Sequence, residues 1–252
     1  DDFEKLHNSL AKIDDINKLI EPLFNDKVFE LNKNKFNFQN TLDELIFNKF
    51  EGQIDTGEMM DALLNKAYKS NIRIINNVSV ESYEDIGPSV KVNTNQFTIS
   101  CNKLFIATNG FSESIIQEKV VPARAQVLIT KPIKNLKVIG TFHFQQGYYY
   151  FRNIDDRILL GGGRNLDFHI ENTNQFGVTD TIQSKLEQLL TDVILPQSNF
   201  EIEQRWSGIM GIGNKKNTIT KQLSNNVYCG VRLGGMGVAI GTNIGSELAN
   251  LI

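Results

Sequence analysis

A glycine-rich turn near the end of the chain has the residue types that cofactor binding requires. Glycine has no Cβ, so a ligand can approach the backbone closely. A helix that starts at such a turn directs unpaired N–H groups and a positive dipole end at that ligand. The pattern predicts a site for an anion, or for a ring that becomes anionic on reduction; plain packing of helix on strand is the alternative. The turn lies between a strand-like stretch at 227–231 and a helix-like stretch at 238–252, and its residues are Gly234, Gly235, Met236 and Gly237.

Other arrangements that carry chemistry are missing from this sequence. No GxGxxG lies between a strand and a helix, as the dinucleotide fingerprint requires. Gly208, Gly211 and Gly213 have that spacing reversed. The three histidines are scattered, with no carboxylate at metal-ligand spacing, so we expect no metal. No GxSxG nucleophile motif occurs either.

The composition is that of an ordinary globular protein. The 252 residues include 26 basic and 29 acidic ones, a net charge of −3, which predicts no nucleic-acid partner. The two cysteines favour reduced, buried thiols and a cytoplasmic location. No stretch approaches the ~20 apolar residues of a membrane span, and no signal peptide is present. The chain opens at Asp1 without Met, so we expect a fragment, a processed form or the visible part of a longer chain.

Hydrophobic periodicity and turn residues predict alternating helices and strands. A short hairpin or an irregular segment is expected over 26–50, and a hairpin over 90–100. Asp55 or Thr56 is expected to cap the second helix, and Asn71 to end it. Helices are expected over 1–25, 56–70, 176–195 and 238–252. Strands are expected over 72–75, 78–80, 104–107, 120–130, 147–153, 157–163, 200–213 and 227–231.

One predicted strand has aromatic side chains on both faces. Tyr148, Tyr150 and Arg152 alternate along it and should share one face, with Tyr149 and Phe151 on the other. The first face is either a ligand-binding surface or an aromatic surface that only packs.

Six segments, taken in order, resemble the D-amino-acid oxidase and glycine oxidase family of FAD-dependent oxidoreductases. EGQIDTGEMMDALLNKAYKSNIRIINNVSVES is similar to that family's "G-x-(I/L)-D-P" helix and strand, and LFIATNG to its "VVxATG" strand. VVPARAQVLIT resembles "PxRGQ", and YYYFRNIDDRILLGGG resembles the "YxxPR…(L/V)xxG" hairpin. RWSGIMGIGNKKNTIT resembles "WxGLRP…(D/N)xxPxIG", and VYCGVRLGGMGVAIG the closing "GxxGxG" flavin turn. The resemblance covers about residues 45–252.

The resemblance implies an α/β fold of mixed α+β type. An incomplete, Rossmann-like FAD-binding domain would be interleaved with a mixed-sheet substrate domain. The FAD-binding domain would comprise residues 50–120 and 200–252, and the substrate-binding domain would comprise residues 1–49 and 121–199. The family's βαβ unit with GxGxxG does not occur here, so we expect the chain, as a fragment, to be inactive by itself and to bind FAD weakly.

The resemblance also implies the site residues. Tyr148 would lie by the substrate. Met210 stands where amino-acid-oxidising members have an Arg that pairs with the substrate carboxylate, and a thioether cannot make that bond. Arg232 or Arg152 is expected to supply the anion contact instead, whereas Arg205 is expected to form a structural salt bridge. The residues expected to contact FAD are Val80, Ala107, Thr108, Asn109, Gly110, Gly208, Gly234, Gly235, Met236, Gly237 and Val238.

The implied reaction is oxidation of a small-molecule amine or amino acid by hydride transfer to flavin N5. FAD would be the cofactor, with O₂ or another molecule reoxidising it. No membrane partner is expected. Two alternatives stay open: an accessory protein that keeps the scaffold without catalysis, and a 2-hydroxy-acid dehydrogenase on the same fold.

Overall fold

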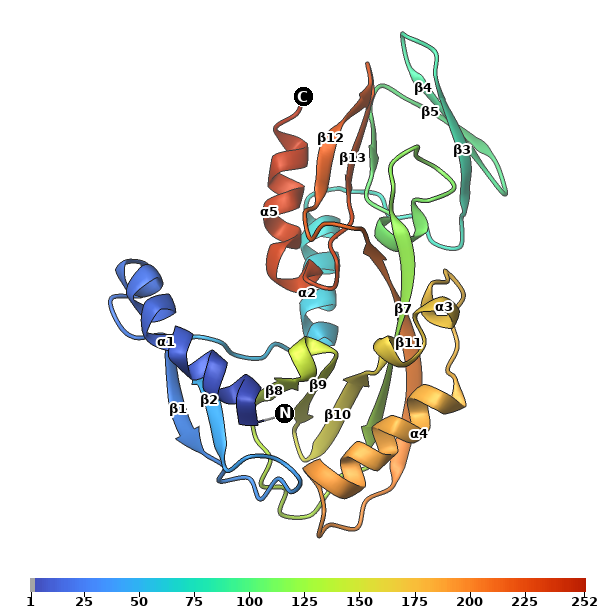
Figure 1. Cartoon of the computed structure of the whole chain (residues 1–252). Helices are drawn as coiled ribbons and strands as arrows, with labels where there is room; N and C mark the ends of the chain where they lie inside the picture. Colours follow the sequence, from blue (N-terminus) through green and yellow to red (C-terminus); the bar gives the residue numbers. More distant parts are fainter. Residues whose placement is uncertain (1–2) are drawn as a thin grey trace. The chain divides into compact units, whose positions relative to one another are not determined.

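The computed structural model describes residues 3–252, whose helices and strands are shown in Figure 1. They form the mixed α/β structure that the sequence predicts. The residues group into two compact units, each assembled from three stretches of chain. The first unit runs to Asp61 and resumes over Gln126–Leu166 and Val178–Trp206. The second comprises Ala62–Ala125, Asp167–Gly177 and Ser207–Ile252.

The first unit begins with a helix and a hairpin. Helix α1 (Phe3–Phe24) precedes β1 (Phe29–Lys33) and β2 (Glu44–Asn48), which pair antiparallel as expected for 26–50. Asn17 of α1 is buried, and its side-chain amide donates to the carbonyl of Phe29 and accepts from the N–H of the same residue. One asparagine therefore fastens the helix to the start of the hairpin.

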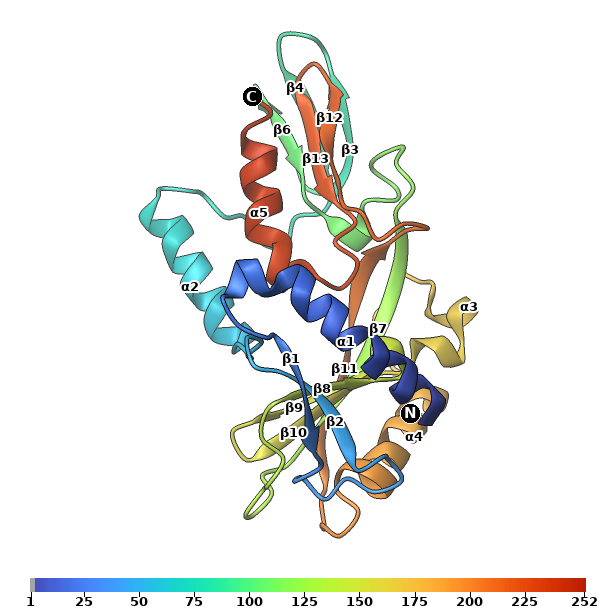
Figure 2. The same ribbon diagram turned by 60° about the vertical axis from the view of Figure 1, so that its left-hand side comes forward.

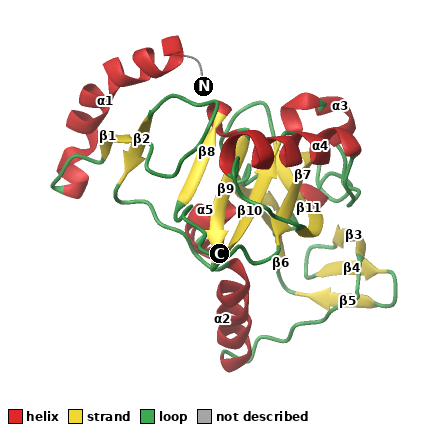
Figure 3. Ribbon diagram, turned by 90° about the horizontal axis from the view of Figure 1, so that it is seen from below, coloured by secondary structure: helices red, strands yellow, loops and turns green. Residues whose placement is uncertain are grey.

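A five-stranded sheet forms the main body of the first unit, with strand order β11-β7-β10-β9-β8. Helix α4 (Asp180–Leu189), continued by a π-helical turn at Leu190–Ile194, covers one face of it (Figure 3). Apolar side chains from the helix and from that face form a buried core, which includes Leu128, Tyr149, Phe151, Ile158, Leu160, Ile182, Leu186 and Leu190. The strands are β7 (Val121–Thr130), β8 (Thr141–Phe144), β9 (Tyr149–Ile154), β10 (Arg157–Gly162) and β11 (Ile202–Ile212); β7 and β11 have residues in both units.

The second unit contains a three-stranded sheet with order β12-β13-β6. Strand β13 (Val227–Val231) is buried throughout and pairs antiparallel with β12 (Ile219–Ser224) and parallel with β6 (Leu104–Ile106). Helix α5 (Gly237–Ala249) lies beside β12 and β13 in two views (Figures 1 and 2). The helix comes so close to the sheet that a Cβ at Gly230 would lie 3.2 Å from side-chain carbons of Ile244 and Leu248.

A second sheet of this unit is an antiparallel meander of β3 (Val80–Asp85), β4 (Val90–Thr94) and β5 (Thr98–Cys101). Asp85 connects it to the β12–β13 turn. Its carboxylate accepts hydrogen bonds from the hydroxyl of Ser224 (2.6 Å) and from the backbone N–H of Asn226 (2.9 Å). These bonds hold the pKa of Asp85 well below its usual range.

The remaining helices are short or join larger elements. Helix α2 (Thr56–Lys69) is capped as predicted, since Asp55 Oδ1 accepts from the N–H groups of Gly57 and Glu58 at 2.8 and 3.0 Å. Asn71 follows it with φ of +58°, the left-handed conformation of a helix end. The others are α3 (Phe168–Glu171), η1 (Asn109–Phe111), η2 (Gln145–Gly147) and η3 (Arg164–Leu166). Within residues 3–252, no helix combines the length and apolar character needed to cross a membrane.

Several predicted boundaries are wrong. Residues 72–75 do not form a strand: Ile72 and Ile75 are more than half exposed, and no strand among residues 3–252 pairs with this segment. Because a strand exists only through hydrogen bonds to a neighbour, apolar content alone misled the prediction. Tyr148 precedes β9 rather than belonging to it, with helical φ and ψ of −68° and −22°. The helix expected from 176 begins at Asp180, and the elements α3, β8 and β12 were not predicted.

Candidate functional site

The turn between β13 and α5 has the open backbone that its glycines predict. Gly234 and Gly235 have φ of +59° and +82°, which L side chains rarely adopt. A Cβ at Gly234 would meet no protein atom within 4 Å, so this side of the turn is open. Met236 provides no side-chain hydrogen bond to the start of α5, and both Met236 and Val238 are more than half exposed. The start of α5 therefore presents apolar side chains beside an uncapped helix end.

Two hydrogen bonds hold this closing turn against other segments of the second unit. The N–H of Leu233 donates to Asn109 Oδ1 at 3.0 Å, and the N–H of Gly234 donates to the carbonyl of Gly211 at 2.9 Å. Asn109 belongs to the loop after β6, and Gly211 belongs to β11. The expected FAD residues of the β6 loop and of the closing turn thus lie together in one unit.

The β6 loop is packed tightly where it meets β11. Gly110 is buried, and a Cβ there would lie 2.7 Å from the carbonyl oxygen of Met210. Ala107 and Thr108 are exposed, so the same loop also has an open side. Only a glycine at position 110 lets the β6 loop come this close to β11.

Met210 packs against the closing turn. Its Sδ would lie 3.1 Å from a Cβ at Gly235. The side chain thus occupies space under the turn and brings no charge to it. Gly208, two residues earlier on β11, has no protein atom within 4 Å of a Cβ position.

Arg232 is held by the segment before β12. It has φ of +64°, an uncommon conformation for a residue with a side chain. Its Nε donates to the carbonyl of Asn217 at 2.7 Å, and its Cδ would lie 2.6 Å from a Cβ at Gly213. The Nε atom of Arg232 therefore holds the segment before β12 in place. Val80 begins β3 in the meander and belongs to a different sheet from β13.

The first unit carries the residues of the predicted aromatic strand. Tyr149 and Phe151 are buried in the core beneath α4, whereas Tyr150 is about 40% exposed, so the faces divide as predicted within β9 itself. Tyr148 is equally exposed but precedes the strand. Arg152 shares the face of Tyr150, and one of its terminal nitrogens (Nη1) donates to the carbonyl of Ile54 at 2.5 Å. The open face of β9 is therefore polar and aromatic.

Tyr150 is a candidate that the sequence reasoning did not assign to the site. It lies opposite Gly161 of β10, where a Cβ would come within 2.6 Å of the tyrosine hydroxyl oxygen. Desolvation of the hydroxyl raises the pKa of Tyr150. The signal was in the sequence, because Tyr150 was expected to share a strand face with Arg152 in a hairpin that ends in glycines.

Arg205 is structural, as expected. Its guanidinium forms an ion pair with Glu187 at 2.6 Å and donates to Gln183 Oε1 at 2.7 Å, both on α4. These contacts connect β11 to the helix within the first unit. The second unit has a buried ion pair, in which the guanidinium of Arg124 donates two hydrogen bonds of 2.9 Å to the carboxylate of Glu171.

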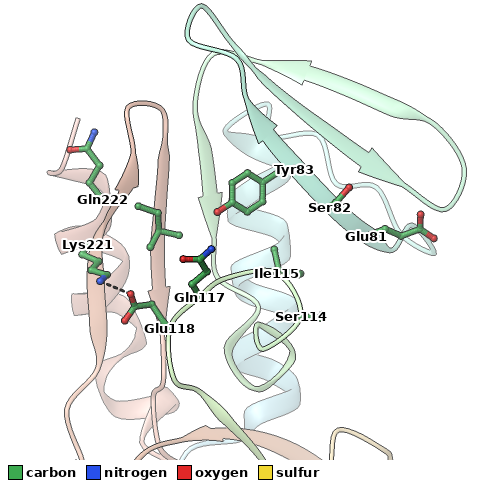
Figure 4. Close-up of a pocket in the computed structure, with 10 residues that line it drawn as sticks. Glu81, Ser82, Tyr83, Ser114, Ile115, Gln117, Glu118, Lys221 and Gln222 are labelled. Carbon is green, nitrogen blue, oxygen red and sulfur yellow. Dashed lines mark ion pairs between the residues drawn. The ribbon is translucent and has the colours of Figure 1, made fainter.

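A hollow of about 470 Å³ in the second unit lies between β3, the loop at 114–118 and β12 (Figure 4). Lys221 and Glu118 form an ion pair of 2.5 Å at its edge. Burial raises the pKa of Tyr83. None of the residues expected to form the site lines this hollow; those that do are Glu81, Ser82, Tyr83, Ser114, Ile115, Gln117, Glu118, Lys221, Gln222 and Leu223. Among residues 3–252, no cluster of three or more His, Cys, Asp or Glu side chains is arranged to hold a metal ion.

The fold is shared with a dehydrogenase, an oxidase and a deaminase of known structure. An L-proline dehydrogenase from P. horikoshii is 20% identical with a TM-score of 0.80, over 99% of this chain and 69% of that chain. A glycine oxidase from Bacillus cereus is 13% identical with a TM-score of 0.74, over 95% and 70%. An L-amino acid deaminase from Proteus vulgaris is 16% identical with a TM-score of 0.74, over 99% and 66%. The chain thus spans about two thirds of the length of these proteins.

The sequence itself identifies the family. Residues 20–251 match the model of the FAD dependent oxidoreductase family, DAO. The chain belongs to this family, as its six motifs predicted. No sequence among the curated proteins matches it.

Proposed function

We propose that this protein uses FAD to oxidise an amine or an amino acid. The observation that carries the proposal is the closing turn, an open glycine backbone that leads into an uncapped helix at the end of a buried strand. Family membership supports FAD as the cofactor. The names of the structural neighbours, which include a proline dehydrogenase and a glycine oxidase, support an amino-acid substrate.

The residues present fit a flavin. Gly208 and Gly234 leave open space where side chains would otherwise stand, and the N-terminus of α5 favours negative charge. We expect the closing turn and the β6 loop, Ala107 to Gly110, to hold the cofactor. FAD held there would supply a hydride acceptor for oxidation of the carbon that bears the amine. The backbone N–H groups at the start of α5 would stabilise negative charge on a flavin ring held at this turn.

The open face of β9 is the proposed substrate surface. The hydroxyl of Tyr150 can donate a hydrogen bond to a substrate, and Tyr148 and Arg152 add a second hydroxyl and a cation. Arg152 or Arg232 would pair with a substrate carboxylate in place of Met210. No side-chain base is needed if the amine enters unprotonated, and no histidine or carboxylate among residues 3–252 is assigned that role.

One observation favours a different function. Met210 packs against Gly235 and brings no charge to the closing turn. A non-catalytic accessory protein on this scaffold is therefore the second candidate. A 2-hydroxy-acid dehydrogenase on the same fold is separated from an amine oxidase by substrate screening, because it would oxidise alcohols and leave amines unchanged.

The test is the visible absorption spectrum of the protein expressed from its complete gene. We expect a flavin spectrum that bleaches when an amine or amino acid is added without oxygen. A flavin spectrum that bleaches only with 2-hydroxy acids would show that the substrates are 2-hydroxy acids and not amines or amino acids. A colourless protein that stays colourless after FAD is added would refute the proposal that this protein is an FAD-dependent enzyme.

A further inference from the structure

Asn109 occupies an unusual position between the two loops that are proposed to hold the flavin. Its backbone has φ of +45°, a left-handed conformation that asparagine tolerates better than most residues with a side chain. It belongs to the β6 loop, yet its Oδ1 accepts the hydrogen bond from Leu233 of the closing turn, 124 residues further along the chain. Its side chain is the only part of residue 109 that reaches this turn by a hydrogen bond in the described structure.

The surrounding contacts leave that side chain little freedom. A Cβ at Gly211 would lie 2.6 Å from Asn109 Oδ1, so β11 needs a glycine where the amide passes. The carbonyl of the same glycine accepts the N–H of Gly234. Neighbouring residues of the closing turn are thus bonded to two different segments, the β6 loop and β11.

We propose that Asn109 is a positioning residue that sets the conformation of the closing turn for the cofactor. Without its side chain, Leu233 loses its hydrogen-bond acceptor and the turn keeps only the bond from Gly234 to β11. Because the turn must adopt one conformation to receive the flavin, a mobile turn binds it more weakly. The inference rests on the proposed function, since it assumes that the turn receives FAD.

Asn109→Gly is the informative variant. Glycine adopts a φ of +45° without strain, so the β6 loop keeps its path while the acceptor is lost. Asn109→Asp retains an acceptor oxygen at the same place and serves as the rescue. Asn135→Gly is the matched control, because Asn135 also has a left-handed backbone (φ +58°) and is exposed on a loop of the first unit.

Two measurements on the protein from the complete gene test the proposal. The first is hydrogen exchange of the Leu233 amide without FAD, which we expect to be about tenfold faster in Asn109→Gly than in the wild type or Asn109→Asp. The second is the FAD dissociation constant by fluorescence titration. Because one hydrogen bond is lost, we expect the FAD dissociation constant of Asn109→Gly to rise about fivefold to tenfold. The dissociation constant of Asn135→Gly should not change.

The outcomes are distinct. Unchanged exchange at Leu233 in Asn109→Gly would overturn the proposal, and so would faster exchange with an FAD affinity within about twofold of the wild type. A wild-type protein that binds no FAD would overturn the proposed function and this inference with it. Wild-type binding with an unaltered variant would overturn the inference alone.

Discussion

Gly110→Ala is the substitution whose cost the structure determines most directly. A Cβ at this position would lie 2.7 Å from the carbonyl oxygen and 2.9 Å from the carbonyl carbon of Met210, and 2.9 Å from Cγ2 of Ile209. Two of these three atoms are backbone of β11, so the strand or the loop must move. Inserting a methyl group into a packed site costs about 1–3 kcal/mol, and backbone neighbours put this case near 3.

The assay is thermal unfolding without added FAD. For a chain of this size each kcal/mol lowers Tm by about 2–4 °C, so Gly110→Ala should unfold about 6–12 °C below the wild type. Gly208→Ala is the control, because a Cβ there meets no protein atom within 4 Å, and its free energy of unfolding should change by less than about 0.5 kcal/mol. A Gly110→Ala variant within about 1 °C of the control would refute the packing argument.

Further predictions concern charge. Glu171→Ala should lower the free energy of unfolding by about 3–5 kcal/mol in a denaturant titration, because it leaves the buried Arg124 guanidinium unpaired; the double variant with Arg124→Met should be closer to the wild type. Asp85→Ala should lower stability at pH 7, and the difference should shrink as the pH falls below about 4, because the depressed pKa means that the carboxylate stabilises the fold only while it is ionised. A constant difference in urea unfolding between pH 7 and pH 3 would contradict this. Arg232→Ala should raise KM for an anionic substrate about tenfold or more if Arg232 binds the carboxylate, and an unchanged KM excludes it.

Much of the fold was readable from local pattern. The cap at Asp55, the end of α2 at Asn71, the long strand β7 and the hairpin of β9 and β10 each follow from a few neighbouring residues. Segments whose structure depends on distant partners were harder. Residues 72–75 have strand-like side chains but no pairing strand among residues 3–252, whereas the four-residue strand β8, which was not predicted, pairs with β9.

The candidate site was predictable only in its residue types. The glycines of the closing turn stand out in the sequence, and the structure gives two of them left-handed backbones. The hydrogen bond from Leu233 to Asn109 joins residues 124 positions apart, which no spacing rule reveals. The contact between Tyr150 and Gly161 likewise depends on the register of a hairpin and on the direction of one side chain.

The interleaving of the two units has a consequence for biosynthesis. Each unit is made of three stretches separated along the chain, and the last stretch of the first unit ends at Trp206 while that of the second begins at Ser207. During translation the first unit cannot complete its sheet until β11 has left the ribosome, and the second must wait for β13 and α5. Pairings between distant segments form slowly, and incomplete sheets expose strand edges that aggregate. Nascent chains of this protein should therefore depend on chaperones for most of their synthesis, and neither unit can be produced by cutting the gene at a single point.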